Sequence, residues 1–208
     1  MRVFTQGWSS HDEAQPWGGD DLAPDLEADF AEPDAPARVV AAARNALGPL
    51  DVLVVNHARS GHGRLGELTA EHIDDFLHEN LRAPLLLVQE FAAQFEGESG
   101  AIVLLTSGAH RGPMTREIAY AVSKGALAVA TPTLAEALVD RGIRLNTVNP
   151  GPTATGWTEG MDWGNRIPFG RIGEPDDAAR LIAWLCSDDG RWVTGQVIDS
   201  EGGFRRWS

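Results

Sequence analysis

Apolar and polar residues follow two different patterns along this chain: short apolar runs and longer amphipathic stretches. Residues 101–106 read AIVLLT after Gly100, an apolar and β-branched run that is typical of a fully buried strand. Residues 52–55 and 143–148 predict two more buried strands. Because helical stretches separate the predicted strands, the order indicates an α/β fold built around a parallel sheet.

The helical stretches are marked by residues that begin and end helices. Pro36 stands at the start and Gly48 at the end of an Ala/Val/Arg-rich stretch, which predicts a helix between them. Thr69 is a candidate N-cap for the next helix, in which we expect a kink or a new turn at Pro84. A further helix is predicted over residues 119–139.

The composition describes a single globular domain over residues 1–208, with 43% hydrophobic and 23% charged residues. Cys186 is the only cysteine, so no disulfide forms within the chain and we expect a reducing, cytoplasmic compartment. No apolar stretch approaches about 18 residues and no secretion signal is present, so no membrane association is expected. The net charge of -13 and the pI near 4.8 argue against nucleic acid as a partner.

The chain contains one tyrosine and one lysine, and they stand four residues apart as Tyr120 and Lys124. Residues at this spacing lie on one helical face, so the ammonium can sit close to the phenol. A positive neighbour favours the phenolate, and we therefore expect the pKa of Tyr120 to fall from about 10 toward neutral pH. The pair predicts a proton donor and acceptor; the alternative is a surface tyrosine beside a solvated lysine.

Two further polar residues stand at informative intervals from this pair. Ser107 follows the predicted strand 101–106 and precedes Tyr120 by 13 residues, and Asn80 precedes Ser107 by 27. Together with Tyr120-Ala-Val-Ser-Lys124, this spacing resembles the short-chain dehydrogenase/reductase family, and the resemblance extends over about residues 2–204. It implies a Rossmann-like, doubly wound parallel sheet and a catalytic tetrad of Asn80, Ser107, Tyr120 and Lys124.

The resemblance also implies a role for each member of the tetrad. Tyr120 would exchange a proton with the substrate oxygen, and Ser107 would polarise the same oxygen. Lys124 would lower the pKa of the tyrosine and hold the nicotinamide ribose, while Asn80 would anchor a water that links the lysine to solvent. The hydride would come from NAD or NADP, since no side chain can supply it.

Further motifs resemble the cofactor-binding positions of the family. Asp29 and Phe30 stand where the family contacts adenine, and Thr155 stands where it contacts the nicotinamide. No usable acid or base directly follows the strand expected near residues 3–5, so NAD and NADP both stay open. The full set of cofactor contacts implied by the resemblance is Asp29, Phe30, Asn56, Ala58, Tyr120, Lys124, Pro150, Gly151, Thr153 and Thr155.

One departure from the family follows the strand 52–55. Where the family has Asn-Asn-Ala-Gly, this chain has Asn56-His57-Ala58-Arg59. Arg59 puts a side chain and a cation where the glycine lets the backbone pass close to the cofactor, so we do not transfer the glycine's role. His57 can be a polar cap at a strand end, or a ligand or base.

A larger departure concerns the N-terminal side of the fold. Residues 2–5 resemble the second strand of the family, and the only G-x-G-x-x-G run in the chain, at residues 61–66, lies too late to be the family's glycine-rich turn. The first strand and the glycine-rich turn, which cradles the cofactor pyrophosphate, have no counterpart. We therefore expect a sheet that is truncated or rearranged on this side. Loss of cofactor binding by this chain is one expected consequence.

Three explanations fit this departure. The sequence can be an incomplete reading of a longer gene. Alternatively, the sheet closes by pairing residues 2–5 directly with residues 51–56, or by borrowing an edge from a second copy. In the third, the N-terminal segment is displaced and only the C-terminal α/β core is native. The expected assembly is a homodimer or homotetramer.

Aromatic, glycine and methionine residues concentrate in residues 155–171, which resemble the mobile substrate lid of the family. The alternative is a surface loop that packs on itself. The crevice beneath would suit an aromatic or otherwise apolar carbonyl compound, with or without an acidic group. The candidate substrate contacts are His110, Arg111, Met114, Trp157, Met161 and Trp163.

The sequence supports one principal function and two alternatives. The principal hypothesis is an NAD(P)-dependent oxidoreductase that reduces a small-molecule carbonyl or oxidises an alcohol. The first alternative is a cofactor-independent proton-transfer enzyme, such as an isomerase, dehydratase or cyclase, that uses the same tetrad. The second is a non-catalytic partner subunit. No metal site is expected.

Overall fold

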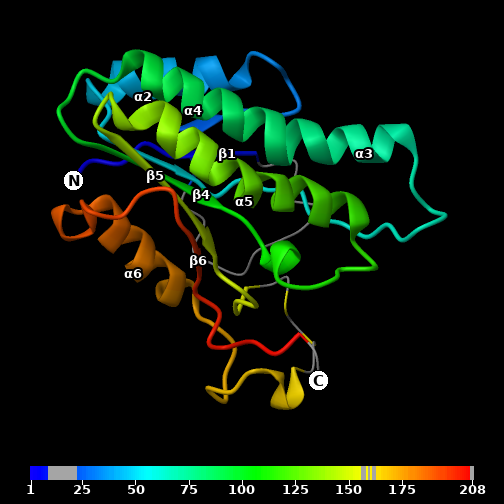
Figure 1. Ribbon diagram of the computed structural model, residues 1–208. Helices are drawn as coiled ribbons and strands as arrows, with labels where there is room; N and C mark the ends of the chain where they lie inside the picture. The colour runs from blue at the N-terminus through cyan, green and yellow to red at the C-terminus, as the bar shows by residue number, and fades with distance from the viewer. Residues whose placement is uncertain (9–22, 156–157, 159, 161–162, 207–208) are drawn as a thin grey trace.

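The computed structural model describes residues 1–8, 23–155, 158, 160 and 163–206. These residues form two parallel sheets, which confirms the expected α/β class (Figure 1). The smaller sheet pairs β1 (Gln6–Gly7) with β2 (Leu26–Glu27). The larger sheet contains, in spatial order, β3 (Val52–Val55), β4 (Gly100–Leu105), β5 (Ile143–Asn149) and β6 (Val197–Asp199).

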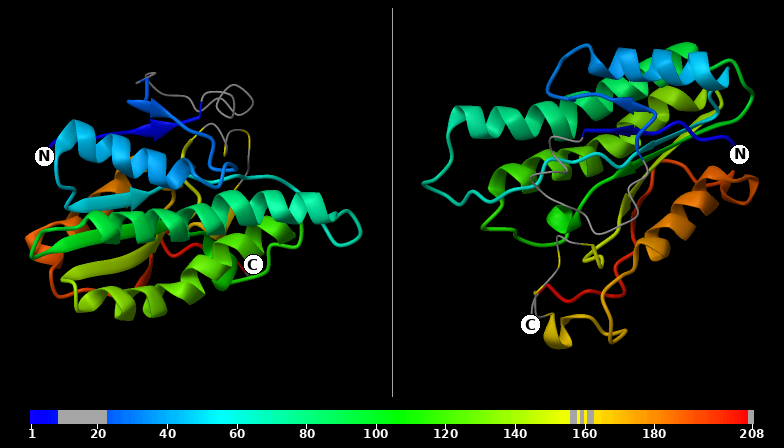
Figure 2. Two further views of the ribbon diagram at one scale, coloured as in Figure 1. Left: turned by 90° about the horizontal axis from the view of Figure 1, so that it is seen from above. Right: turned by 180° about the vertical axis from the view of Figure 1, so that it is seen from behind.

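Helices cover both faces of the larger sheet (Figures 1 and 2). Alternate residues of β4 point to opposite faces, as strand geometry requires. Ile102 and Leu104 join the core beneath α2, α4 and α5, whereas Val103 and Leu105 pack with α6 on the other side. The helices are α2 (Ala35–Leu47), α3 (Ala70–Leu77), α4 (Ala83–Gln94), α5 (Ile118–Val139) and α6 (Pro175–Cys186), with short turns η2 (Gly108–His110), η4 (Gly164–Arg166) and η5 (Asp188–Gly190).

The predicted helix boundaries are confirmed at the ends where capping residues stand. Gly48 follows α2 with φ of 85°, a conformation that favours glycine. The hydroxyl of Thr69 accepts the His72 N–H at 3.1 Å and caps α3. The helix does not run on unchanged at Pro84, because a π-helical turn, η1 (His78–Arg82), separates α3 from α4. Proline has no N–H to donate into the preceding turn, which agrees with this break.

The N-terminal side differs from two expectations. The strand lies at Gln6–Gly7 rather than at residues 2–5, because pairing with β2 begins only after Pro24, which has no N–H to donate. Among the described residues, β1 pairs with β2 and β3 pairs with β4, so the direct pairing of residues 2–5 with residues 51–56, one of the alternatives considered above, does not occur there. The large sheet therefore presents the second edge of β3 without a ladder partner in the part of the chain that the structure describes.

Among the described helices, α5 alone is long and apolar enough to cross a membrane, judged by length and composition. Here it packs against β5 and buries Ser123, Lys124 and Thr131 on that side. The Thr131 hydroxyl lies 2.6 Å from the Thr147 hydroxyl of β5. The helix therefore acts as a core helix of the α/β unit, a type that passes the same length and composition test.

Candidate active site

The predicted catalytic residues come together where β4 ends and α5 begins. Ser107 follows β4, Tyr120 and Lys124 lie in the first turns of α5, and Asn80 lies in η1, which packs against α5. Ligands bind at the carboxyl ends of parallel strands in α/β sheets. The spacing in the sequence therefore identified residues that the fold brings to one functional edge.

Lys124 is buried, and backbone carbonyls surround its ammonium. Its Nζ donates to the carbonyl of Leu105 at 2.8 Å and to that of His57 at 3.5 Å. The Thr106 hydroxyl donates to the Lys124 carbonyl at 2.7 Å. Burial lowers the pKa of Lys124 from 10.5 to about 8, because the charged form loses its hydration. This group can therefore gain and lose a proton near neutral pH.

The pKa of Tyr120 moves in the direction opposite to the prediction. It is raised from 10.0 to about 12, first by burial and then by the charge of Glu117, while a hydrogen bond with Ser107 lowers it. The expectation that Lys124 brings this pKa toward neutral is wrong, because the ammonium is bound to backbone carbonyls and burial disfavours the phenolate. At neutral pH the phenol is protonated, which is the form that donates a proton.

Asn80 is fully buried, and its amide joins the loop after β3 to α5. Its Oδ1 accepts the Arg59 N–H at 2.7 Å, and its Nδ2 donates to the Arg59 carbonyl at 2.9 Å and to the Ser123 hydroxyl at 3.1 Å. Ser123 in turn donates to the Tyr120 carbonyl at 3.0 Å. Single π-helical turns often occur at functional positions, and η1 is one. The water relay expected of Asn80 stays a prediction.

Arg59 and His57, where the sequence departs from the family, share one buried carboxylate. Arg59 Nη1 lies 2.7 Å from Glu79 Oε1, and His57 Nε2 lies 3.5 Å from Glu79 Oε2. Burial alone would raise the pKa of Glu79, but the nearby His57 imidazole and the hydrogen-bonded Arg59 guanidinium outweigh it and lower the pKa. Sequence reasoning did not select Glu79, although an acid directly before Asn80 was a visible signal.

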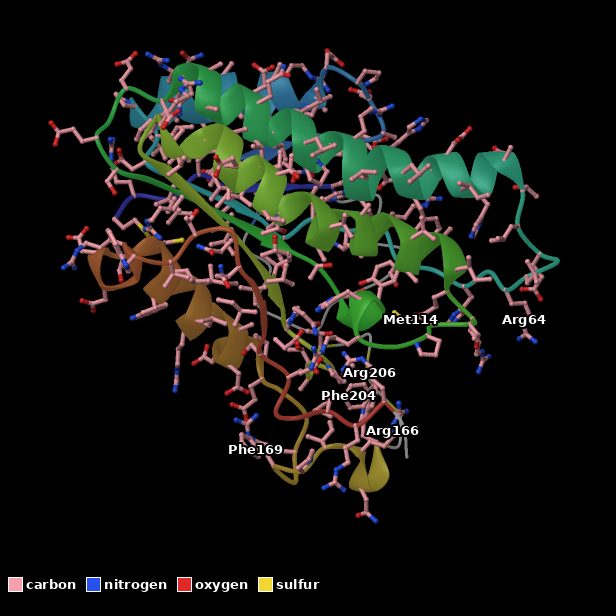
Figure 3. All side chains as sticks on the ribbon, viewed as in Figure 1. Arg64, Met114, Arg166, Phe169, Phe204 and Arg206 are labelled. Carbon is pink, nitrogen blue, oxygen red and sulfur yellow. The ribbon has the colours of Figure 1, made fainter. Side chains whose placement is uncertain are left out.

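Ser107 caps η2, and its hydroxyl lies between Tyr120 and Met114. Its Oγ accepts the Ala109 N–H at 3.3 Å and lies 4.0 Å from the sulfur of Met114 (Figure 3). A thioether is a weak acceptor, so this hydroxyl keeps the capacity to donate to the oxygen of a bound molecule. The structure thus places Met114 beside Ser107, and its contact with substrate stays a prediction.

His110 and Arg111, also expected to contact substrate, turn toward the end of β6. His110 Nε2 and Arg111 Nε lie 3.4 and 3.1 Å from the carboxylate of Asp199. His110 Nδ1 also lies 3.1 Å from the Ser107 carbonyl. These contacts join the turn that carries Ser107 to β6. Sequence reasoning did not select Asp199 as a site residue.

The turn after β5 is held by a side chain of the strand itself. Asn149 accepts the Gly151 N–H at 3.1 Å and donates to Asp199 and Glu201, both at 2.8 Å. Gly151 has φ of 67°, and a Cβ there would lie 2.3 Å from the Cβ of Glu201. Both the conformation and the space therefore require glycine at this predicted cofactor position.

Pro150, Thr153 and Thr155 follow the same strand end, as predicted. The Thr153 hydroxyl donates to the Gly151 carbonyl at 3.1 Å, and the Thr155 hydroxyl lies 3.5 Å from the Thr153 carbonyl. All three residues are half-buried. The structure therefore brings the predicted nicotinamide-side residues to the functional edge of the sheet.

The residues predicted on the adenine side have mixed surroundings. Phe30 is 2% exposed, and its ring packs edge-on against the ring of His57 with centroids 4.9 Å apart. The ring therefore lies in the core, and a contact between Phe30 and the cofactor stays a prediction. Asp29 accepts the Ala31 N–H at 2.8 Å, while Asn56 is exposed after β3 and Ala58 is half-buried.

The predicted lid is described only in part, and Trp157 and Met161 lie outside the described residues. Trp163 packs edge-on against Phe204 with ring centroids 5.8 Å apart. A hollow of about 530 Å³ is lined, among the described residues, by Arg64, Leu65, Thr115 and Arg116, none of which is a predicted site residue.

Comparisons with known proteins agree with this geometry. A family model described as enoyl-(acyl carrier protein) reductase matches residues 9–205. An uncharacterized oxidoreductase, YjdA, of Bacillus subtilis is 44% identical over 166 residues, covering 77% of this chain and 66% of the relative. The chain belongs to the short-chain dehydrogenase/reductase family. The short-chain dehydrogenase/reductase FrzI of Cladobotryum sp. is 34% identical, covering 86% of this chain and 74% of the relative.

Solved structures of this family confirm the Rossmann-like fold. A short-chain dehydrogenase from Burkholderia cenocepacia in complex with NADP superposes with a TM-score of 0.81, at 36% identity, over 86% of this chain and 75% of that one. A blue fluorescent protein from a metagenomic library, in complex with NADPH, gives a TM-score of 0.80 at 36% identity, over 86% and 74% of the two chains. The chain thus spans about two thirds to three quarters of these short-chain dehydrogenase/reductase proteins.

Proposed function

We propose that this chain catalyses the NAD(P)-dependent interconversion of a carbonyl and an alcohol group on a small molecule. One observation carries the proposal: Ser107 and Tyr120 meet where β4 ends and α5 begins, close enough for Ser107 to lower the pKa of Tyr120, and the only lysine of the chain lies one turn further along the same helix. Two hydroxyls can then bind one substrate oxygen. The raised pKa of Tyr120 keeps its phenol protonated, ready to give its proton to that oxygen during reduction.

The remaining tetrad members support this step. Ser107 would donate a hydrogen bond to the same oxygen and stabilise the negative charge that develops on it. Lys124, with its pKa near 8, would return a proton to Tyr120 after each reduction. Asn80 would hold the loop and helix around Lys124 and anchor the water through which protons reach it. During oxidation the same groups would move the proton in the reverse direction.

The residues around Tyr120 fit the nicotinamide half of the cofactor. Gly151 offers backbone without a side chain, and the hydroxyls of Thr153 and Thr155 lie next to it. Tyr120 and Lys124 would hold the ribose. The nicotinamide, when bound, supplies or accepts the hydride, since no side chain can. The NADP and NADPH complexes of the structural neighbours support this cofactor class, and NAD and NADP are both candidates.

A second candidate is proton transfer without a nicotinamide, as in an isomerase, dehydratase or cyclase. The observation that favours it is the sequence, which keeps the tetrad but has its only G-x-G-x-x-G run at residues 61–66, after β3, rather than after a first strand where the family binds the pyrophosphate. Such an enzyme would use Tyr120 and Ser107 on a substrate oxygen and would leave NADH unconsumed.

The decisive experiment titrates the chain with NADH and NADPH while recording energy transfer from its tryptophans to the reduced nicotinamide. We expect saturable binding of at least one cofactor, and its oxidation when small aromatic or aliphatic carbonyl compounds are added. Tyr120→Phe is the matched control, because it should still bind the cofactor through the remaining contacts and turn over poorly. Failure of both cofactors to bind would overturn the proposal. Conversion of substrate without nicotinamide would then support the second candidate.

A further inference from the structure

The C-terminal segment turns back toward the catalytic edge, and Figure 3 shows Arg206 beside η2. Arg206 donates from Nη1 and Nη2 to the two carboxylate oxygens of Glu201 at 2.7 and 2.5 Å. The two side chains are only 14% and 8% exposed. A guanidinium and a carboxylate joined by two parallel hydrogen bonds have a fixed mutual geometry. The pair is therefore a rigid feature of the molecule rather than a mobile surface contact.

The guanidinium of Arg206 packs against the turn that carries the catalytic serine. A Cβ built on Gly108 would lie 1.7 Å from Arg206 Nη2 and 2.5 Å from its Cζ. Gly108 follows Ser107 immediately and begins η2. Only glycine leaves room for this contact, so the missing side chain at position 108 and the arginine at position 206 form one unit.

The same unit reaches the opposite wall of the site. Glu201 accepts from Asn149 at 2.8 Å, and Asn149 also binds Asp199 and the Gly151 N–H. Asp199 in turn pairs with Arg111 at the end of η2. The carboxylates of Asp199, at the end of β6, and of Glu201, just after it, thus link the serine turn to the turn that follows β5.

Phe204 supports the arginine from a third side. Its ring centroid lies 5.0 Å from the Cζ of Arg206 and 4.7 Å from the Cζ of Arg166 (Figure 3). Cations over an aromatic face are attracted to it, so the ring holds the arginine in the plane set by Glu201. By contrast, the neighbouring Arg205 is exposed.

We propose that Arg206 is a positioning residue, which clamps Gly108 against Glu201 and so holds the Ser107 hydroxyl at Tyr120. The role of Ser107 in turnover rests on the proposed function, whereas the clamp is a property of the fold. A displacement of about 1 Å at a reacting group can cost about a hundredfold in rate. Loss of a contact one residue away from the catalytic serine can displace its hydroxyl by such a distance.

The first test measures the clamp without any turnover. Hydrogen–deuterium exchange should become about tenfold faster at the amides of Ala109, Arg111 and Gly112 in Arg206→Met, because their turn loses a charged anchor. Methionine keeps the apolar stem of the arginine, which protects the fold. Arg205→Met is the matched control, since it removes the same charge from the adjacent exposed position and should leave the exchange unchanged.

A second measurement follows the serine itself through the only tyrosine. The Ser107 hydrogen bond lowers the pKa of Tyr120, so release of the turn should raise that pKa. The tyrosinate absorbance of folded Arg206→Met should then fall below that of the wild-type chain at a pH between 10 and 12. Gly108→Ala provides an independent variant, because its Cβ displaces the guanidinium while both members of the ion pair remain.

The kinetic test separates positioning from binding. In both variants kcat should fall about ten- to a hundredfold while the cofactor dissociation constant changes less than about twofold. Arg206→Lys should recover only part of the rate, since lysine cannot form two parallel bonds. Adding Ser107→Ala to Arg206→Met should cost much less than it costs alone, because both changes act on one group.

The outcomes decide the proposal in each case. Unchanged exchange in both Arg206→Met and Gly108→Ala would overturn the clamp. Faster exchange with unaltered kcat and an unaltered tyrosine titration would overturn the positioning of Ser107. If the wild-type chain turns over no carbonyl, the proposed function fails separately, and the tyrosine titration alone then supports or refutes the positioning.

Discussion

The surroundings of Lys124, which we call the inner end of the site, differ from those of Tyr120, which we call the outer end. At the inner end, Asn80, Ser123 and Lys124 are 0%, 0% and 2% exposed, and protein groups accept or donate each of their hydrogen bonds described above. At the outer end, Tyr120 and Ser107 are only half-buried, and the serine hydroxyl has a sulfur and a phenol as side-chain neighbours. One turn of helix separates the two environments.

This difference shows how one pair of residues can divide two tasks. Burial removes hydration from the ammonium of Lys124, and the surrounding backbone carbonyls compensate by accepting its hydrogen bonds. The outer hydroxyls keep unused hydrogen-bonding capacity, which a substrate oxygen can take up. Changes at the outer end should therefore affect rate without affecting stability, and changes at the inner end should affect stability in a pH-dependent way.

The largest expected effect comes from Tyr120→Phe at the outer end. Removing the only phenol should lower kcat by about 10²- to 10⁴-fold, the usual contribution of a general acid. The free energy of unfolding should change by only about 1 kcal/mol, the value of one hydrogen bond to Ser107. Steady-state kinetics and urea unfolding measure the two quantities on the same preparation. A stability loss as severe as the rate loss would show that the outer end is structural.

At the inner end, Lys124 should give stability a characteristic pH dependence. Its pKa is about 8 in the folded chain and 10.5 in the reference state, so between these values the unfolded chain binds more protons. Stability should therefore rise with pH across this window, by on the order of 3 kcal/mol in total, and be flat with respect to this group below it. Urea unfolding at a series of pH values measures the rise, which Lys124→Met should abolish.

Two other groups oppose this rise and have to be controlled. Burial raises the pKa of Cys186, so its contribution to stability falls as the pH exceeds its ordinary value of 9.0. Tyr120, with its pKa raised to about 12, contributes a similar fall above pH 10. The series is best made in a Cys186→Ala background and ended below pH 10. A curve that stays flat in this background would mean that Lys124 is not buried as a cation.

The same contrast explains how much the sequence predicted. The Tyr120–Lys124 pair and the position of Ser107 at a strand end follow local rules, whereas Asn80 and the tetrad as a set came from the resemblance to the family. Local rules also predicted the caps at Thr69 and Gly48.

What the sequence did not predict depends on contacts between distant segments. The direction of the Tyr120 pKa was wrong because burial cannot be counted from a spacing of four residues. The ion pairs of Glu79 with Arg59 and of Glu201 with Arg206 were also missed. Their place beside the tetrad depends on how the chain folds back, which the spacing of residues along the sequence does not reveal. The sequence also did not predict that the described strands form two separate sheets, because contacts between distant segments decide which strand edges pair.

The smallest expected effect concerns the ion pair that supports the inner end. Glu79→Gln should lower the free energy of unfolding by about 2 kcal/mol, because Arg59 loses its buried partner but remains 38% exposed. Asp75→Asn is the matched control: it removes the exposed half of the same network, 3.0 Å from Arg59, and should cost less than about 1 kcal/mol.

The pH dependence of this difference provides the final test of the inner end. The pKa of Glu79 is lowered from 4.5 in the folded chain, so its stabilisation is present above that value and disappears as the pH falls through the folded pKa. The gap in unfolding free energy between the wild-type chain and Glu79→Gln should therefore be largest near neutral pH and shrink below pH 4.5. A gap that stayed constant on acidification would mean that the carboxylate is held by packing rather than by Arg59 and His57.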